Sequence, residues 1–333
     1  MQPRIVVLGS ANLDLVYRVP RIPTPGETLL ATGTAQHPGG KGNNQVIAVA
    51  RAGASVAFIA ALGKDAAAEL LSESLAEAGV IDLIRRVDEA TGTALITVDD
   101  NAENTIIVNS GANARLVDLT ESERATIAAA NFLLMQLETP IDTVIDAARV
   151  GKAAGTTVVL NAAPARELPA DLLGLLDILV VNEHEALTVA GGLARAVSLP
   201  ESVTVDTAGS VGEVLLAAVA AVVITLGSDG AVVIDENGVM HIPSPRVTAI
   251  DTTGAGDTLC GALVAGLAEG MRLRAATTFA TIAAALSVQK TGAVPSIPFR
   301  REIDAFAALG VIAPAGWSVM CQDMPDSSAS IDL

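Results

Sequence analysis

The chain has 333 residues, of which 51% are hydrophobic, so it can bury a large core and is not a disordered protein. Its net charge of -17 and its aromatic content of 2% exclude the broad basic or stacking surfaces that bind nucleic acid. The longest apolar run, Val214 to Leu226, has about 13 residues, fewer than the roughly 20 of a membrane-spanning helix. With no export signal before Ile5 to Leu8, we expect a soluble cytoplasmic protein without nucleic-acid or membrane partners.

Short β-rich runs alternate with Ala-rich helical stretches along most of the chain. The predicted strands are Ile5 to Leu8, Val56 to Ala61, Phe132 to Gln136, Thr157 to Leu160, Ile178 to Val181 and Val222 to Leu226. This alternation predicts an α/β fold with a central, mostly parallel sheet flanked by helices on both faces.

Four segments depart from this alternation. Residues of about 15–36 and 92–109 contain β-branched alternation and turn residues, which predict antiparallel strands in a small β-sheet lid. The segment Gly191 to Ser210 is rich in small and polar residues and is expected to be a loop or insertion. Residues 313–333 are expected to form a weakly structured tail, which leaves 1–312 as the main domain.

Polar residues follow several of the predicted strands. Asn12 and Asp14 follow the first strand, and Glu138 follows Phe132 to Gln136. Other polar strand ends are Asn182 with Glu183, and Thr225 to Gly227. Because ligands of open α/β sheets bind beyond the carboxyl ends of the strands, these residues together predict a cleft.

The segment Gly39 to Gln45 reads Gly-Gly-Lys-Gly-Asn-Asn-Gln and enters an apolar helix. Glycines allow close approach of the backbone, and Lys and Asn supply donors suited to a polyhydroxylated ligand. A glycine turn capped by Asn would give the same local pattern. The sequence therefore indicates either a binding loop or an ordinary helix start.

A second glycine motif, Asp251 to Thr258, reads Asp-Thr-Thr-Gly-Ala-Gly-Asp-Thr and is followed by an apolar helix to about Gly270. The backbone of Gly254, Ala255 and Gly256 can form an anion hole at the positive end of that helix. Asp257 in the first turn can then take the proton of a substrate hydroxyl during phosphoryl transfer. The alternative is an ordinary helix start, where Asp is common.

Motifs of other enzyme classes do not occur in the sequence. It has no P-loop, no G-x-S-x-G elbow and no G-x-G-x-x-G dinucleotide fingerprint. His184-Glu185 begins a metalloprotease pattern, but position 188 is Thr. Hydrolase and dehydrogenase functions therefore lose their main support.

The chain resembles the ribokinase-type carbohydrate kinases over about nine tenths of its length. The motifs that carry the resemblance are Val7 to Ser10 with Asn12 and Asp14, Pro23 to Thr28, Gly39 to Gln45, Leu134 to Glu138, Asn161 to Pro169, Thr225 to Ser228 and Asp251 to Thr258. The resemblance implies a phosphotransferase with an alcohol group as acceptor, with ATP as donor and ribose as the favoured sugar. It also implies Asp257 as general base and the Gly254 to Gly256 backbone as anion hole.

The resemblance assigns further residues to three ligands. The sugar would be bound by Asn12, Asp14, Gly40, Lys41, Asn44, Glu138 and Asp257. ATP would be bound by Asn182, Thr225, Gly227, Ser228, Gly256 and Thr281, where Thr281 replaces a His that is frequent in the family. Potassium would be bound at Asp251, Thr253, Ser287, Lys290, Gly292 and Ser296, and magnesium, held mainly by phosphates and water, near Asn182 and Glu185.

The resemblance also implies that the lid closes over the sugar and joins two copies into a homodimer, which would exclude water from the reaction. Two other interpretations stay open. The substrate could be deoxyribose, another sugar or a nucleoside, because one missing hydroxyl changes few contacts. A non-catalytic sugar-binding protein is the second alternative, although such a protein would need neither Asp257 nor the anion hole.

Overall fold

The computed structural model describes residues 4–101, 103–194 and 197–310. A nine-stranded sheet forms its centre, with the strand order β15-β14-β13-β12-β11-β10-β1-β4-β6. Its strands are β1 (Ile5–Leu8), β4 (Val56–Ile59), β6 (Ile81–Asp82), β10 (Phe132–Met135), β11 (Thr157–Asn161), β12 (Ile178–Asn182), β13 (Ala221–Thr225), β14 (Ala231–Asp235) and β15 (Gly238–Ile242). The short strands β5 (Ala61–Leu62) and β7 (Arg85–Arg86) form a separate pair.

The prediction of a mostly parallel sheet is confirmed. β1 pairs in parallel with both β10 and β4, and the parallel pairing continues through β11, β12 and β13. All four residues of β1 are buried, as expected for a strand covered on both faces. The hairpin of β14 and β15 adds two antiparallel strands at one edge, which the sequence analysis did not predict.

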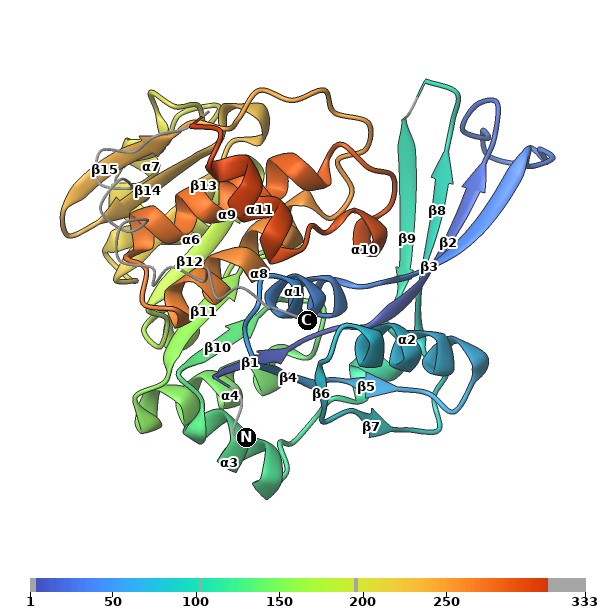
Figure 1. Ribbon diagram of the computed structural model, residues 1–333, viewed down its shortest axis with the longest axis horizontal. Coiled ribbons are helices and arrows are strands. Elements are labelled where there is room, and N and C mark those ends of the chain that lie inside the picture. Colours follow the sequence, from blue (N-terminus) through green and yellow to red (C-terminus); the bar gives the residue numbers. More distant parts are fainter. Residues whose placement is uncertain (1–3, 102, 195–196, 311–333) are drawn as a thin grey trace, which may run out of the picture.

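Helices cover both faces of the sheet (Figure 1). One face packs against α1 (Lys41–Arg51), α2 (Ala66–Glu77), α8 (Ala255–Ala268), α9 (Leu273–Ser287), α10 (Ala293–Ser296) and α11 (Arg300–Ala307). The other packs against α3 (Glu121–Ala129), α4 (Ile141–Ala154), α5 (Ala170–Leu173), α6 (Glu183–Leu193), α7 (Ala208–Leu216) and the 3-10 turn η1 (Gly111–Arg115). Successive strand residues point to opposite faces of the sheet: Val7 packs in the core on the α1 and α8 side, and Leu8 packs in the core on the α3 and α4 side.

The lid is a second sheet that projects to one side of the helix-covered body (Figure 1). Its order is β3-β2-β8-β9, from β2 (Asn12–Arg18), β3 (Gly33–Gly39), β8 (Gly92–Val98) and β9 (Asn104–Asn109). The prediction of antiparallel strands in a small separate sheet is confirmed by the pairs β2–β3 and β8–β9. The parallel pairing of β2 with β8, which joins them, was not predicted. β2 begins at Asn12, so Asn12 and Asp14 lie within the lid's own strand and not in a loop after β1.

The predicted loop Gly191 to Ser210 is shorter in the structure, because α6 runs to Leu193 and α7 begins at Ala208. The apolar run Val214 to Leu226 contains the end of α7 and all of β13, which agrees with the predicted strand Val222 to Leu226. The predicted tail, residues 313–333, lies outside the described residues. Within the part of the chain that the structure describes, no helix combines the length and apolar character needed to cross a membrane.

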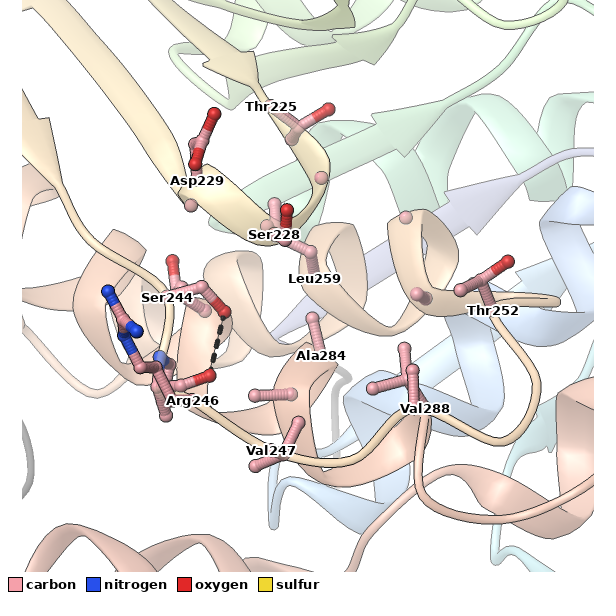
Figure 2. Close-up of a pocket in the computed structure, with 18 residues that line it drawn as sticks. Thr225, Ser228, Asp229, Ser244, Arg246, Val247, Thr252, Leu259, Ala284 and Val288 are labelled. Carbon is pink, nitrogen blue, oxygen red and sulfur yellow. Dashed lines mark hydrogen bonds between the residues drawn. The ribbon is translucent and has the colours of Figure 1, made fainter.

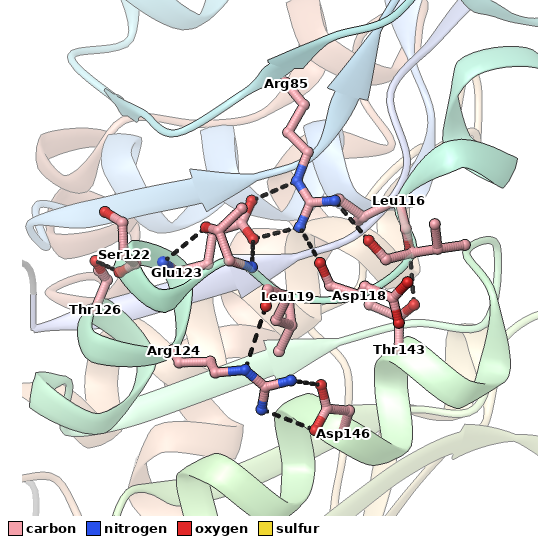
Figure 3. Close-up of polar contacts among 12 residues, drawn as sticks. Arg85, Leu116, Asp118, Leu119, Ser122, Glu123, Arg124, Thr126, Thr143 and Asp146 are labelled. Atoms are coloured by element: carbon pink, nitrogen blue, oxygen red, sulfur yellow. Dashed lines mark hydrogen bonds and ion pairs between the residues drawn. The ribbon is translucent and has the colours of Figure 1, made fainter.

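Two Arg-carboxylate pairs fasten α3 to its neighbours (Figure 3). Arg85 of β7 binds both carboxylate oxygens of Glu123 and donates to the carbonyl of Val117 at 2.6 Å. Glu123 also completes a capping box with Thr120 at the start of α3. Arg124 pairs in the same bidentate way with Asp146 of α4. This cluster of ion pairs connects β7, α3 and α4 on the second face of the sheet.

Candidate active site

The helix α8 begins at the glycine motif that the sequence analysis singled out. Gly254 is its N-cap and has a φ of 74°, a left-handed conformation that favours glycine. A Cβ there would also lie 2.9 Å from Ala293 Cβ, so α10 packs directly on the turn. Asp257 lies in the first helical turn and is 8% exposed. The Ala255 N–H donates to the Thr252 carbonyl at 3.2 Å, whereas the other first-turn N–H groups have no partners within the helix. The Gly254 to Gly256 backbone can therefore bind an anion beside this carboxylate.

The glycine loop before α1 packs against the junction of β1 and β2. Gly40 has a φ of 87°, and a Cβ there would lie 2.8 Å from the Asn12 backbone nitrogen. This close packing places Asn44 Nδ2 2.9 Å from Asp257 Oδ2. It also lets the Lys41 N–H donate to Glu138 Oε2 at 3.1 Å. The two glycine motifs, more than 200 positions apart, therefore meet at one site, with a separation of 213 residues between Asn44 and Asp257.

Three carboxylates and one ammonium group gather there. Burial, reinforced by the charges of Glu138 and Asp257, raises the pKa of Asp14 from its ordinary 3.8 to about 7. Burial opposes the charge of Lys41, but the attraction of Asp257 and Glu138 outweighs it and raises the pKa of Lys41. Gly39 makes room for Asp14, because a Cβ on Gly39 would lie 2.1 Å from Asp14 Oδ2. The site is polar, partly dehydrated and crowded with negative charge.

Every residue that was predicted to bind the sugar falls in this cluster. Asn12, 3% exposed, accepts a hydrogen bond at Oδ1 from Asn113 Nδ2 at 2.8 Å. Ser10 Oγ donates to Glu138 Oε2 at 2.5 Å and holds that carboxylate near Lys41. Ser10 and Asn113 were not among the predicted site residues. Ser10 belongs to the motif Val7 to Ser10. No sequence pattern around Asn113 indicates a binding residue, because η1 is brought to the site only by the tertiary packing.

A cavity of about 610 Å³ opens between the β13–β14 turn and the helices α8 and α9 (Figure 2). The predicted ATP residues Thr225, Gly227, Ser228, Gly256 and Thr281 all line it. Its remaining walls mix apolar and polar side chains, including Asp229, Ser244, Arg246, Val247, Thr252, Leu259, Ala284 and Val288. Its size and its mixed lining suit a planar base with a sugar attached.

A smaller cavity of about 140 Å³ adjoins the large one, with Thr225 and Gly256 lining both. Lys41, Asn182, Glu185 and Asp257 line it as well. Asn182, predicted to bind ATP, lies here and not at the large cavity, because it caps α6: its Oδ1 accepts the Glu185 N–H at 2.8 Å. Burial raises the pKa of Glu185. The small cavity thus connects the Asp257 carboxylate with the large cavity.

The positions predicted for potassium form a second cluster beside Gly254. Asp251 accepts the N–H of Thr253 at 2.9 Å and that of Gly292 at 2.8 Å. The Ser287 and Ser296 hydroxyls donate to local carbonyls, and Lys290 Nζ pairs with Glu302 at 3.1 Å, so at Lys290 only the carbonyl could contact an ion. Among the described residues, no group of three or more His, Cys, Asp and Glu side chains is placed to hold a metal ion.

Comparisons with known proteins agree with this geometry. The family description "pfkB family carbohydrate kinase" matches residues 2–300. A protein named Ribokinase from Haemophilus influenzae is 40% identical over 307 residues, which cover 91% of this chain and 97% of that protein. One from Staphylococcus aureus is 39% identical and covers 91% of this chain and 99% of its own length.

Solved structures give the same result. The crystal structure of Thermotoga maritima ribokinase is similar with a TM-score of 0.84 at 34% identity, covering 92% of this chain and 99% of its own. The structure of Arabidopsis thaliana ribokinase complexed with ribose and ATP has a TM-score of 0.84 at 32% identity, covering 92% and 98%.

Proposed function

The chain belongs to the pfkB family of carbohydrate kinases, and we propose that it is an ATP-dependent ribokinase. In this reaction the 5-hydroxyl of D-ribose attacks the γ-phosphoryl group of ATP, giving ribose 5-phosphate and ADP. One observation carries the proposal: Asp257 is held in the first turn of α8, at the small cavity that connects the sugar residues to the large cavity.

Asp257 would act as the general base. Its carboxylate would accept the proton of the attacking hydroxyl, and the N–H groups of Gly254, Ala255 and Gly256 would stabilise the charge on the transferred phosphoryl group. Lys41, the only ammonium group among the sugar residues, would offset the charge that gathers during the transfer. The sugar hydroxyls would be bound by the polar residues around Asp257, namely Asn12, Asp14, Gly40, Lys41, Asn44 and Glu138.

ATP would occupy the large cavity, with its phosphates directed toward the small one. Thr281, Ala284 and Val288 on one wall would contact the base, and the Thr225 to Ser228 turn would contact the nucleotide from the other side. The shared lining residues Thr225 and Gly256 lie where the phosphates would pass. Asn182 would contact the phosphate end of the nucleotide and not its base.

Two cations fit the residues present. Carboxylate, hydroxyl and carbonyl oxygens around Asp251, Thr253, Ser287, Lys290, Gly292 and Ser296 are the hard ligands that potassium takes. When bound there, potassium would order the turn before α8 and add positive charge near the anion hole. Magnesium would reach the phosphates through water from Glu185, whose carboxylate lines the small cavity.

The lid would close over the sugar and join two copies of the chain. We expect the lid to be part of a single kinase domain that covers residues 1–312, and we expect the enzyme to be cytoplasmic. Its strand β9 is exposed along its whole length, including Ile106, Ile107 and Val108, which are 52%, 63% and 49% exposed. An exposed apolar strand at a sheet edge is suited to pairing with a second copy.

An ADP-release assay with a panel of ribose, deoxyribose, fructose and adenosine tests the proposal. We expect turnover with ribose well above the others, and higher turnover with potassium than with sodium at constant magnesium and ionic strength. Preference for another sugar or nucleoside of the panel would change the substrate assignment but leave the proposed kinase mechanism intact. Absence of turnover with the whole panel, from protein that binds ribose, would contradict the kinase assignment.

A further inference from the structure

A chain of buried carboxamides leads from the end of β10 to Asp257. Gln136 Nε2 donates to Gln45 Oε1 at 2.6 Å, and Gln45 Nε2 donates to Asp257 Oδ1 at 2.9 Å and to Asn161 Oδ1 at 3.0 Å. Gln45 and Gln136 are both 0% exposed. The proposed reaction assigns no task to Gln136, Gln45 or Asn161, which we call the amide chain.

The orientation of the amide chain follows from the charge of Asp257. An ionised carboxylate can only accept hydrogen bonds, so Gln45 has to present its amino group to it. Its oxygen then faces Gln136, which has to present an amino group in turn. Consistent with this order, Gln136 Oε1 is buried without a hydrogen-bond partner. The chain therefore supplies hydrogen-bond donors in one direction only, toward the base.

Each oxygen of the Asp257 carboxylate has its own donor. Gln45 Nε2 bonds to Oδ1 and Asn44 Nδ2 bonds to Oδ2, both at 2.9 Å. Two donors from consecutive residues of one helix fix the rotation of the carboxylate plane. Because misplacing a reacting group by about 1 Å can lower the rate about 100-fold, holding the Asp257 carboxylate in one orientation should raise kcat.

The backbone around the amide chain leaves it little freedom. A Cβ on Gly9 would lie 1.9 Å from Gln136 Oε1, and a Cβ on Gly261 would lie 2.6 Å from the Gln45 carbonyl oxygen. Asn161 is itself anchored, because its Nδ2 donates to the Val180 carbonyl at 3.2 Å. The Gln136 side chain thus packs tightly against the Gly9 backbone, and the backbone that carries Gln45 packs tightly against Gly261.

We infer that Gln45 is a positioning residue for the catalytic base and that Gln136 sets the orientation of Gln45. This inference rests on the proposed role of Asp257. Gln45 holds Oδ1 toward α1 and keeps the carboxylate plane fixed while the sugar hydroxyl approaches. Gln136 acts one bond further away, so its removal has a smaller effect of the same kind.

The test compares kcat, the KM for ribose and the pH profile of Gln45→Met, Gln45→Glu and Gln136→Met. Met keeps the length of Gln but donates no hydrogen bond. We expect Gln45→Met to lower kcat by about 10- to 100-fold with a smaller change in KM, and to move the acidic limb of the kcat profile to higher pH. Gln45→Glu should move that limb further, because it places a second carboxylate beside the first. Gln136→Met should give a smaller loss.

Thr156→Val is the matched control. It removes a buried hydroxyl that bonds the carbonyls of Ile127 and Ala130, away from the site, so it should lower the Tm without changing kcat or the pH profile. A Gln45→Met variant with the kcat and pH profile of the unmodified protein, whatever its Tm, overturns the inference. If Gln45→Met does not fold, an unchanged kcat and pH profile in Gln136→Met overturns it instead.

Asp257→Ala distinguishes failure of the positioning role of Gln45 from failure of the catalytic role of Asp257. If this variant has lost its turnover while Gln45→Met keeps it, the positioning role fails and the base survives. If Asp257→Ala keeps its turnover, both fail. In the Asp257→Ala background, Gln45→Met should cause no further loss, since the group that it positions is gone.

Discussion

Two polar clusters, one at the ends of the central strands and one beside α3 on one face of the sheet, differ in how their charges balance. In the ion-pair cluster of Figure 3, Arg85 matches Glu123 and Arg124 matches Asp146. At the candidate active site, the three carboxylates of Asp14, Glu138 and Asp257 gather around the single ammonium of Lys41. A cluster balanced within itself stabilises the fold. A cluster with surplus negative charge and a shifted pKa, as at Asp14, is typical of functional sites.

The largest expected effect comes from the unbalanced cluster. Asp257→Asn keeps the shape of the side chain but removes the base, so kcat should fall by about 100-fold or more. The Tm should change little, because the substitution also removes a charge that repels Asp14. Steady-state kinetics and thermal melting on the same preparation check both parts. Turnover close to that of the unmodified protein would remove the role of Asp257.

The balanced cluster should respond in the opposite way. Arg85→Met leaves Glu123, whose side chain is 6% exposed, without its partner. Because Arg85 itself is partly exposed, we expect a loss of about 2–3 kcal/mol in the free energy of unfolding, less than for a fully buried pair, with kcat unchanged. Urea unfolding measures the loss. A stable variant with reduced kcat would show that the two clusters are coupled.

Asp14→Asn should make the protein more stable at high pH while weakening ribose binding. The folded chain keeps a proton on Asp14 up to a pKa of about 7, whereas the unfolded chain releases it near 3.8. The ionised form therefore costs stability, and that cost grows between pH 4 and 7 and stays constant above. We expect Asp14→Asn to raise the free energy of unfolding by about 1–2 kcal/mol at pH 8 and not at all at pH 4. The gain is smaller than the full pKa shift implies, because water screens the half-buried carboxylate.

The smallest effect should come from an exposed pair. Arg149 and Asp171 lie 2.8 Å apart with side chains 58% and 53% exposed. Arg149→Ala should change the free energy of unfolding by less than about 0.5 kcal/mol, since water screens such pairs. Urea unfolding of Arg149→Ala and Arg85→Met under the same conditions compares the two losses in the free energy of unfolding. An equal loss in both variants would mean that pairing alone, and not burial, sets the stability of the Figure 3 cluster.

The sequence predicted those features that depend on short motifs. The left-handed backbone at positions 40 and 254 favours glycine, and the nearby polar residues Asn44 and Asp257 lie where that backbone places them. Features that depend on contacts between distant segments were missed. The parallel pairing of β2 with β8 and the arrival of Asn113 beside Asn12 have no local signal, because only the assembled fold brings these segments together. Gln45 stood inside a quoted motif, but its bond to Asp257 requires the packing of α1 on α8.

The separation of 213 residues between Asn44 and Asp257 also bears on how the chain is synthesised. A nascent chain that has emerged only as far as β13 already contains every other predicted sugar residue, yet it lacks α8. It cannot retain ribose through the complete set of contacts until translation passes residue 257. Because a ligand that binds only the finished site stabilises only the finished chain, ribose in the growth medium would favour completed molecules over truncated ones.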